Sequence, residues 1–327
     1  MQVNELFRQS NTILLDGGMG TMLQAAGLKL GARPEELNIT DPALIEGIHG
    51  QYAAAGSRIV NANTFGASAH KLAGSTYTLE QVITAGIENC KRACAPYGAL
   101  TALDVGPLGE LLEPSGTLAF EDAVAEYARI VKAGEAAGAD LIFFETYTDL
   151  YELKAALLAA KENTRLPILA SMSFEAGGRT FTGCTVESFA ATARGLGADA
   201  VGINCSLGPK EIFPMAKRLA EAVPGNFPVF VKPNAGLPRA DGSGYDITPQ
   251  LFALQMKPYR ELHLFAAGGC CGTTPEFIKL LNGTFAGCTP GRPAHRMPSV
   301  LCTPVDTVTV DGITVVGERI NPTGKKR

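Results

Sequence analysis

Short apolar runs, rich in β-branched and aromatic residues, recur along the chain, and each is followed by a Gly-, Asn- or Pro-containing break and a helix-like stretch. The runs are nearly continuous in hydrophobicity rather than alternating, which is typical of parallel strands covered on both faces. They begin at Ile13, Arg58, Leu100, Leu141, Pro167, Ala200, Pro228 and Leu262. Eight repeated strand–helix units predict a closed (β/α)8 TIM barrel.

Prolines mark the starts of several predicted helices. Proline costs no hydrogen bond at the first helical position, and it occurs in Asp41-Pro42, Gly208-Pro209, Thr248-Pro249 and Thr274-Pro275. An open, doubly wound sheet is the alternative fold. The segment GGMGTM after the first run superficially resembles a dinucleotide-binding loop, but it lacks the third glycine at the required place. The barrel is therefore favoured.

The pattern changes near the carboxyl end of the chain. After the run TPGRP at residues 289–293 comes a proline-bearing stretch, followed by VTVDGITVVGERINPTGKKR, which predicts a new strand pair with a polar ending. We expect the barrel to occupy residues 1–296. Residues 297–327 are expected to form a linker and the beginning of another module of a longer protein.

Composition and charge restrict the class of partner. Hydrophobic residues make up 46% of the 327 residues and charged residues 18%, which indicates a folded globular protein. The formal charge of −4 provides no cationic field for phosphates, so nucleic acid is not an expected partner. The first residues lack the order of a signal peptide, and no apolar run approaches the roughly 20 residues of a membrane span. We expect a cytoplasmic protein with a small-molecule substrate and no membrane contact.

Polar residues gather at the carboxyl ends of the predicted strands, which line the active-site mouth of such a barrel. A buried polar group needs a partner or a ligand, so this ring predicts a cavity that holds a polar molecule. Its members are Asp16, Gly17, Gly18, Asn61, Asn63, Thr64, Asp104, Glu145, Thr146, Asn204, Cys205, Asn234 and the run GGCCG at residues 268–272.

Two acidic residues of this ring are candidates for binding a substrate ammonium group. They are Asp16 and Glu145, and the alternative role for each is a structural ion pair or a helix cap. The glycines that follow Asp16 leave backbone N–H groups open to a carboxylate, much as helix N-termini receive anions.

Three of the eight cysteines lie at strand ends. Cys205 follows the sixth predicted strand, and Cys270 and Cys271 follow the eighth. Three thiolates with an open fourth position are a plausible catalytic zinc site. Adjacent residues of a regular strand point to opposite faces, so the pair needs the chain to leave the strand. The neighbouring glycines permit backbone angles closed to other residues and so let both sulfurs turn inward.

The remaining cysteines and the histidines show no metal-ligand pattern. A buried cysteine is commonly a small apolar side chain, and we expect packing roles for Cys90 and Cys94 on an outer helix. A structural zinc is disfavoured because no C-x2-C knuckle occurs. A zinc hydrolase is disfavoured because its usual His ligands are missing. The side chains set aside are those of Cys184, Cys288, Cys302, His49, His70, His263 and His295.

Together, Asp16-Gly17-Gly18, Asn204-Cys205 and the GGCCG run resemble the homocysteine S-methyltransferase family, over nearly all of residues 10–295. The segments NANTF at 61–65 and FFET at 143–146 also resemble it. The resemblance implies one Zn²⁺ per chain on Cys205, Cys270 and Cys271, which binds the sulfur of L-homocysteine as a thiolate for methyl transfer. It further implies a substrate site in which the amino group is oriented by the two acidic residues, the carboxylate is held by backbone N–H groups, and Asn234 fills the open metal position without substrate. The substrate-binding set is Asp16, Gly17, Gly18, Asn63, Glu145, Asn204 and Asn234.

Within the family the chain most resembles the amino-terminal module of cobalamin-dependent methionine synthases. The run GERINPTG at residues 317–324 looks like the opening of the pterin-binding module. This implies methylcobalamin on another module as methyl donor, methionine as product, and pterin- and cobalamin-binding modules as partners. The chain has no Asp-x-His-x-x-Gly motif, so tight binding of cobalamin is not expected.

Two alternatives stay open at this point. A stand-alone homocysteine methyltransferase would use betaine or S-methylmethionine. A non-catalytic zinc or thiol-redox module would use the neighbouring Cys270 and Cys271 as a vicinal disulfide.

Overall fold

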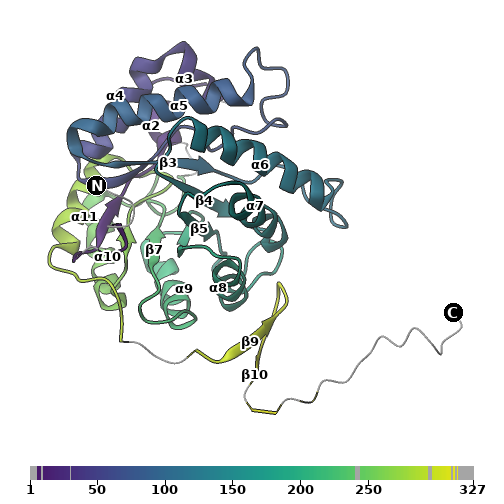
Figure 1. Cartoon of the computed structure of the whole chain (residues 1–327). Helices are drawn as coiled ribbons and strands as arrows, with labels where there is room; N and C mark the ends of the chain where they lie inside the picture. The colour runs from purple at the N-terminus through teal and green to yellow at the C-terminus, as the bar shows by residue number, and fades with distance from the viewer. Residues whose placement is uncertain are drawn as a thin grey trace, which may run out of the picture.

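The computed structural model describes residues 6–8, 10–29, 31–239, 244–293, 297–310, 312, 313 and 315. Eight parallel strands close into a barrel in sequence order, and the helices between them surround it (Figure 1). The predicted (β/α)8 barrel is confirmed. None of the described helices is long and apolar enough to cross a bilayer.

The barrel strands coincide with the eight apolar runs. They are β1 (Ile13–Leu15), β2 (Ser57–Asn61), β3 (Leu100–Val105), β4 (Leu141–Tyr147), β5 (Ile168–Met172), β6 (Ala200–Asn204), β7 (Val229–Lys232) and β8 (Ala266–Ala267). The last strand is shorter than its run because residues 257–262 form a 3-10 helix and His263 has a left-handed backbone, with φ of 49°.

The helices follow the strands as expected. They are α2 (Met19–Ala25), α3 (Leu37–Thr40), α4 (Pro42–Ala54), α5 (Leu79–Cys94), α6 (Phe120–Ala136), α7 (Leu150–Asn163), α8 (Val186–Gly195), α9 (Pro209–Glu221), α10 (Pro249–Met256) and α11 (Pro275–Phe285), with 3-10 turns η1 (Pro34–Glu36), η2 (Ala95–Tyr97) and η3 (Lys257–Leu262). The four helices predicted to start at proline do so. In α4 the Asp41 side chain also accepts the Leu44 N–H at 3.2 Å, which satisfies an amide that the helix leaves free.

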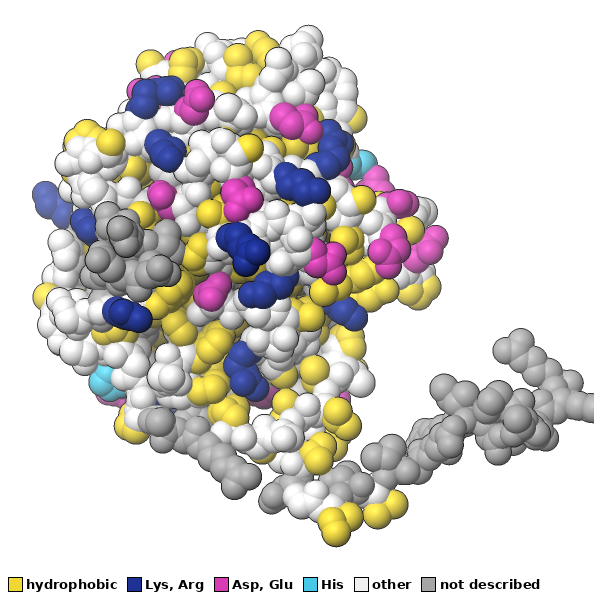
Figure 2. All heavy atoms as spheres, in the orientation of Figure 1, with side chains coloured by type: hydrophobic (Ala, Val, Ile, Leu, Met, Phe, Trp, Pro, Cys, Tyr) yellow, Lys and Arg dark blue, Asp and Glu magenta, His cyan; other side chains and the backbone are white. Residues whose placement is uncertain are grey.

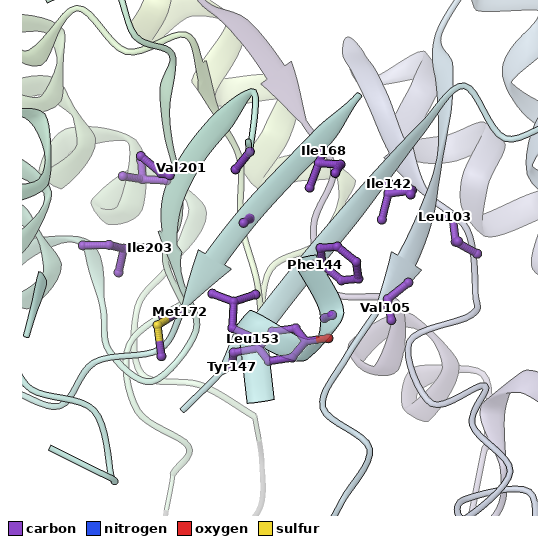
Figure 3. Packing of buried hydrophobic residues seen from close by; sticks show 14 of the residues in the cluster. Leu103, Val105, Ile142, Phe144, Tyr147, Leu153, Ile168, Met172, Val201 and Ile203 are labelled. Atoms are coloured by element: carbon purple, nitrogen blue, oxygen red, sulfur yellow. The ribbon is translucent and has the colours of Figure 1, made fainter. Parts of the chain in front are cut away.

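Outward-pointing strand residues pack beneath the helices. Leu103, Ile142, Phe144, Ile168 and Val201 belong to one buried cluster on this side of the sheet (Figure 3). Burial of such side chains contributes about 25 cal/mol per Å² of apolar surface. The helices thus hold the barrel closed.

Inward-pointing residues form two layers that differ in chemistry. The apolar layer consists of Ile59, Ala102, Phe143, Leu169 and Phe230, and Leu6 lies fully buried in the same cluster. Strand side chains alternate between faces, so residues two positions further point the same way. At those positions stands the polar layer, which consists of Asn61, Asp104, Glu145, Ser171 and Lys232, all buried. The carboxyl end of the barrel therefore carries a polar floor.

A small hairpin follows the barrel. Strands β9 (Ser299–Cys302) and β10 (Thr307–Val310) pair antiparallel beside α8 (Figure 1). Thr185 N–H donates to Pro304 O at 3.2 Å. Apolar side chains of the hairpin remain exposed, among them Leu301, Val305 and Val308 (Figure 2).

The predicted strand pair within residues 308–327 lies largely outside the described residues and stays a prediction. Residues 307–310, which begin this stretch, form β10 and pair with β9, the segment that precedes them. The run at 317–324 lies outside the described residues, as does His295, so the domain boundary at residue 296 stays a prediction.

Candidate metal and substrate site

Three cysteines from two strand ends meet at the mouth of the barrel. The Sγ atoms of Cys205, Cys270 and Cys271 all lie within 4.8 Å of one another, and those of Cys205 and Cys271 are 3.7 Å apart. Tetrahedral zinc with Zn–S bonds of about 2.3 Å places its sulfurs about 3.8 Å apart. The spacing and the donor atoms therefore fit a zinc ion bound by three thiolates.

Glycines make room for this arrangement in two different ways. Gly272 has φ of 79°, a conformation that L side chains rarely adopt. A Cβ at Gly268 would lie 2.7 Å from Asp16 O, and one at Gly269 would lie 2.4 Å from Thr273 Oγ1. The expectation of special backbone angles thus holds for Gly272, whereas Gly268 and Gly269 are required for space.

Hydrogen bonds hold the cysteine loop in place after it leaves β8. Cys271 N–H donates to Asn234 Oδ1 at 3.1 Å, and Cys270 N–H donates to Pro233 O at 2.8 Å. Thr273 Oγ1 donates to Cys270 O at 2.7 Å. Both thiols are therefore oriented by backbone and side-chain contacts in a rigid loop.

The sixth strand ends in a strained turn. Cys205 has φ of 62°, and Thr146, at the end of β4, has φ of 67°. Such angles are genuine outliers for a β-branched residue. The Asn204 amide bridges the two ends, because its Oδ1 accepts Thr146 N–H at 2.9 Å and its Nδ2 donates to Thr146 Oγ1 at 2.8 Å. Strain of this kind clusters at functional sites.

Hydrogen bonds among the three thiols shift their pKa values in different directions. Hydrogen bonds from Cys205 and Cys270 lower the pKa of Cys271 to about 3. Hydrogen bonds to Cys270 and Cys271 raise the pKa of Cys205. Mutual hydrogen bonding thus favours loss of a proton from the three-thiol cluster as a whole.

A cavity of about 360 Å³ opens beside the cysteines. The backbone and glycines after β1 form one wall, and the polar floor of the barrel closes it from below. Its lining includes Asp16, Gly17, Gly18, Glu35, Asn61, Asn63, Phe65, Asp104, Glu145, Thr146, Lys232, Tyr245 and the three cysteines.

Lys232 is the central charge of the cavity floor. It is 2% exposed, and its Nζ lies 3.0 Å from Asp16 Oδ1 and 3.0 Å from Glu145 Oε2. Burial lowers the pKa of Lys232, but the two carboxylates outweigh it and raise that pKa well above its usual value. Burial raises the pKa of Glu145 to about 7, an effect that Lys232 partly offsets. The floor is an ionic cluster of three groups, which come from the residue directly after β1 and from β4 and β7.

Asp104 stands beside this cluster without a comparable partner. It is 7% exposed, and burial followed by the charge of Glu145 raises its pKa well above the usual value. Its Oδ1 accepts no hydrogen bond from any described residue. The floor therefore keeps one carboxyl group unmatched.

Comparison with known proteins agrees with this geometry. The sequence profile of the family described as Homocysteine S-methyltransferase matches residues 13–285. The chain belongs to the homocysteine S-methyltransferase family. It is 32% identical over 337 residues to methionine synthase of Mycobacterium tuberculosis and 32% identical over 344 residues to that of Mycobacterium leprae. Each match covers 95% of this chain and 28% of the relative, so the chain spans a little over a quarter of the length of these family members.

A solved structure of similar shape is the homocysteine methyltransferase MmuM from Escherichia coli. Its metallated form aligns with a TM-score of 0.74 at 24% identity, covering 86% of this chain and 99% of that one. The oxidized form aligns equally well, with 98% of that chain covered. At this identity the likeness supports the family's barrel fold.

Several residues predicted to contact substrate make hydrogen bonds within the framework of the site. Asn63 Nδ2 donates to Pro34 O and to Asn38 Oδ1, although the residue also lines the cavity. Asn204 and Asn234 lie behind the lining, where they support Thr146 and the cysteine loop. The Asn234 oxygen expected at the metal is engaged by the Cys271 amide.

The backbone amide proposed for carboxylate binding is also partly used. Gly18 N–H donates to Thr273 O at 3.3 Å and to Thr273 Oγ1 at 3.2 Å. Gly17 lines the cavity without such a bond among the described residues. The glycine segment is therefore tied to the cysteine loop, which links β1 to β8.

The interpretation of the sequence overlooked Lys232. The sequence does contain a sign that this lysine points into the barrel. It ends the apolar run VFVK in β7, two positions after the inward-pointing Phe230. Tyr245 was also overlooked; its ring lies where a Cβ on Gly272 would stand. Tyr245 comes from the long segment between β7 and α10, for which no structure was predicted.

The other cysteines and the described histidines stand apart from the three-cysteine cluster. Cys90 and Cys94 are buried on α5, with sulfurs 3.8 Å apart, as expected for packing. Cys184 and Cys288 are buried and Cys302 is exposed. His49 is fully buried, and burial lowers its pKa to about 3.

Proposed function

We propose that this chain is the zinc-dependent homocysteine-binding module of a methionine synthase, which activates homocysteine for methylation. The observation that carries the proposal is the convergence of Cys205, Cys270 and Cys271 at zinc-compatible spacing on the wall of a cavity with an acidic floor. When bound, Zn²⁺ supplies a Lewis acid that favours the deprotonated, nucleophilic form of a thiol.

The chain's own residues hold the cysteines in place and bind the rest of the substrate. Asn234 and Thr273 hold the cysteine loop, and Asn204 holds the turn before Cys205. We assign the substrate ammonium to the acidic floor at Glu145 and the substrate carboxylate to the glycine segment at Gly17.

The methyl donor is proposed to be methylcobalamin carried by another module. The two methionine synthases are more than three times as long as the matched region, which supports the presence of further modules. Pterin- and cobalamin-binding modules of the same enzyme are the proposed partners. The competing donor class is betaine or S-methylmethionine. We retain it because the chain shares its barrel fold with the homocysteine methyltransferase MmuM, almost all of which aligns with this chain.

A donor assay tests this proposal. The zinc-loaded chain is incubated with homocysteine and one of methylcobalamin, betaine or S-methylmethionine, and methionine is quantified. We expect methionine from methylcobalamin in amounts that depend on zinc and on Cys271. Formation of methionine from betaine or S-methylmethionine alone would reassign the donor. Absence of homocysteine binding would overturn the function itself.

A further inference from the structure

The metal site must direct the methyl group to one sulfur among several. Cys205, Cys270 and Cys271 supply three thiolates, the substrate supplies a fourth, and every thiolate is a nucleophile. Methyl transfer to a cysteine would form a sulfur–carbon bond, break the bond between the methyl group and its donor, and leave the electron pair of that bond on the donor. The resulting thioether has lost the negative charge of a good zinc ligand. The protein's own sulfurs should therefore be poorer nucleophiles than that of the substrate.

A hydrogen bond to a ligand sulfur provides this difference. A donor N–H or O–H group stabilises the negative charge of a thiolate, as charge-assisted hydrogen bonds generally do. A thioether sulfur is only a weak acceptor, so part of this stabilisation is lost when the sulfur is methylated. A thiolate that accepts such a bond consequently reacts more slowly with a methyl donor.

Tyr245 supplies a donor to Cys271. It lies in the segment between β7 and α10, where its backbone pairs with that of Pro238. A Cβ on Gly272 would lie 2.3 Å from Tyr245 Cγ, so the side chain packs directly over the cysteine loop. Tyr245 lines the cavity, and its hydroxyl is a hydrogen-bond partner of the Cys271 sulfur. A phenol is protonated at neutral pH, so the hydroxyl is the donor towards a thiolate.

The Asn204 amide supplies a donor to Cys270. Asn204 is fully buried, and its Oδ1 accepts hydrogen bonds from Thr146 N–H and from Ser171 Oγ, both at 2.9 Å. These two donors fix the orientation of the amide. Its Nδ2 then donates to Thr146 Oγ1 at 2.8 Å and to Cys270 Sγ at 3.8 Å. The contact with the sulfur is thus imposed by hydrogen bonds to residues of β4 and β5.

Cys205 differs from Cys271 in this respect. Both residues are half-buried, and both line the cavity. Among the described residues, only the neighbouring cysteines are hydrogen-bond partners of the Cys205 sulfur. The cluster therefore contains two sulfurs of similar exposure, one with a phenol donor and one without.

We propose that Tyr245 is a positioning residue that donates a hydrogen bond to the zinc-bound Cys271 thiolate and, together with Asn204 at Cys270, lowers the reactivity of these two sulfurs towards the methyl donor. Methylation is thereby directed to the sulfur of the substrate. This inference rests on the proposed function, because it explains how one thiol is selected among several on the same ion.

Methylation by methyl iodide, a donor that needs no binding site, tests this assignment. The zinc-loaded protein is treated without homocysteine, and S-methylation of each cysteine is followed over time by mass spectrometry of its peptides. Each event forms one sulfur–carbon bond and releases iodide. In Tyr245→Phe the rate at Cys271 should rise about four- to tenfold, because part of a charge-assisted hydrogen bond no longer has to be given up. The rates at Cys205 and Cys270 should stay unchanged.

Matched controls distinguish this effect from a general loosening of the protein. Tyr147→Phe removes a buried hydroxyl that donates to Gly106 O at 3.3 Å on the helix side of β4, and it should leave all three rates unchanged. The exposed Cys302 reports the dose of methyl iodide. Rates are compared at equal zinc occupancy, and Tyr245→Leu provides a second variant without the hydroxyl if Tyr245→Phe fails to fold.

The possible outcomes separate this inference from the proposed function. An unchanged rate at Cys271 in Tyr245→Phe, or an equal rise at Cys205, Cys270 and Cys271, would overturn the role of Tyr245 while leaving the proposed function intact. Failure of the wild-type protein to bind zinc would instead reject the proposed function, and this inference with it.

Discussion

The polar and apolar layers of the barrel interior lie on the same strands, two residues apart, but they have different roles. Ala102 and Phe143 fill the apolar layer without a polar atom on the side chain, whereas Asp104 and Glu145 directly above them bury carboxyl groups. Burial of charge costs free energy that apolar packing does not. The difference indicates that packing below holds the barrel closed and thereby supports an electrostatically costly site above.

Loss of a metal ligand should have the largest effect on function. Cys271→Ala is expected to lower zinc content from about one ion per chain to a small fraction. Methyl transfer should fall by more than the roughly ten- to hundredfold loss that removal of an outer partner causes. Metal analysis and methionine formation provide the measurements. The buried Cys184→Ala is the matched control, and loss of zinc from that variant as well would contradict the assignment of the ligands.

Removal of the central cation should have the largest effect on stability in the polar layer. Lys232→Met leaves Asp16 and Glu145 buried without their counter-ion, and we expect the free energy of unfolding to fall by about 3–5 kcal/mol. Urea denaturation measures this change. The double variant Lys232→Met/Glu145→Gln should be more stable than the single variant, because one uncompensated charge is gone. Equal stability of the two variants would contradict the ionic role of Lys232.

Added bulk within the barrel should disturb packing while sparing the chemistry. A Cβ at Gly202 would lie 2.3 Å from the Phe230 ring, so Gly202→Ala should destabilise the protein by about 1–3 kcal/mol. Its zinc content should remain that of the wild type. Denaturation and metal analysis together check this, and loss of zinc without loss of stability would contradict the separation of the two layers.

Loss of a neutral hydrogen bond in the polar layer should have the smallest effect on the free energy of unfolding. Ser171 Oγ bonds to Asn204 Oδ1 at 2.9 Å, and Ser171→Ala should lower stability by about 0.5–1.5 kcal/mol. Zinc affinity, measured by chelator competition, should also weaken because Asn204 positions the turn before Cys205. Ser57→Ala removes a similar buried bond, to Leu15 O, at the other end of a strand. The two variants should lose similar stability, and a matching loss of zinc affinity in Ser57→Ala would argue against a specific role for Ser171.

The fold and the meeting of Cys205, Cys270 and Cys271 could be predicted from local signals. Continuous apolar runs and helix-initiating prolines are properties of short segments. In the GGCCG run, the glycines beside the two cysteines indicate by themselves that the chain leaves the strand there. The ionic floor depends on which side chains meet across the closed barrel. Asp16 directly follows β1, and Glu145 and Lys232 come from β4 and β7; these strands are not neighbours in the sheet, so neither spacing nor periodicity reveals their contact.

The roles of the asparagines illustrate the same limit. Asn63, Asn204 and Asn234 were correctly singled out as polar residues at strand ends, but a sequence does not tell whether an amide faces a ligand or the backbone. The hydrogen bonds of these amides join residues as far apart as Thr146 and Asn204.

X-ray absorption at the zinc edge tests the central claim most directly. The zinc-loaded protein is measured without and with homocysteine, and the number of sulfur neighbours at about 2.3 Å is compared. We predict three sulfurs from the protein alone and four after homocysteine is added. A sulfur count that does not change on addition of homocysteine, or zinc bound without a three-sulfur shell, would contradict the account.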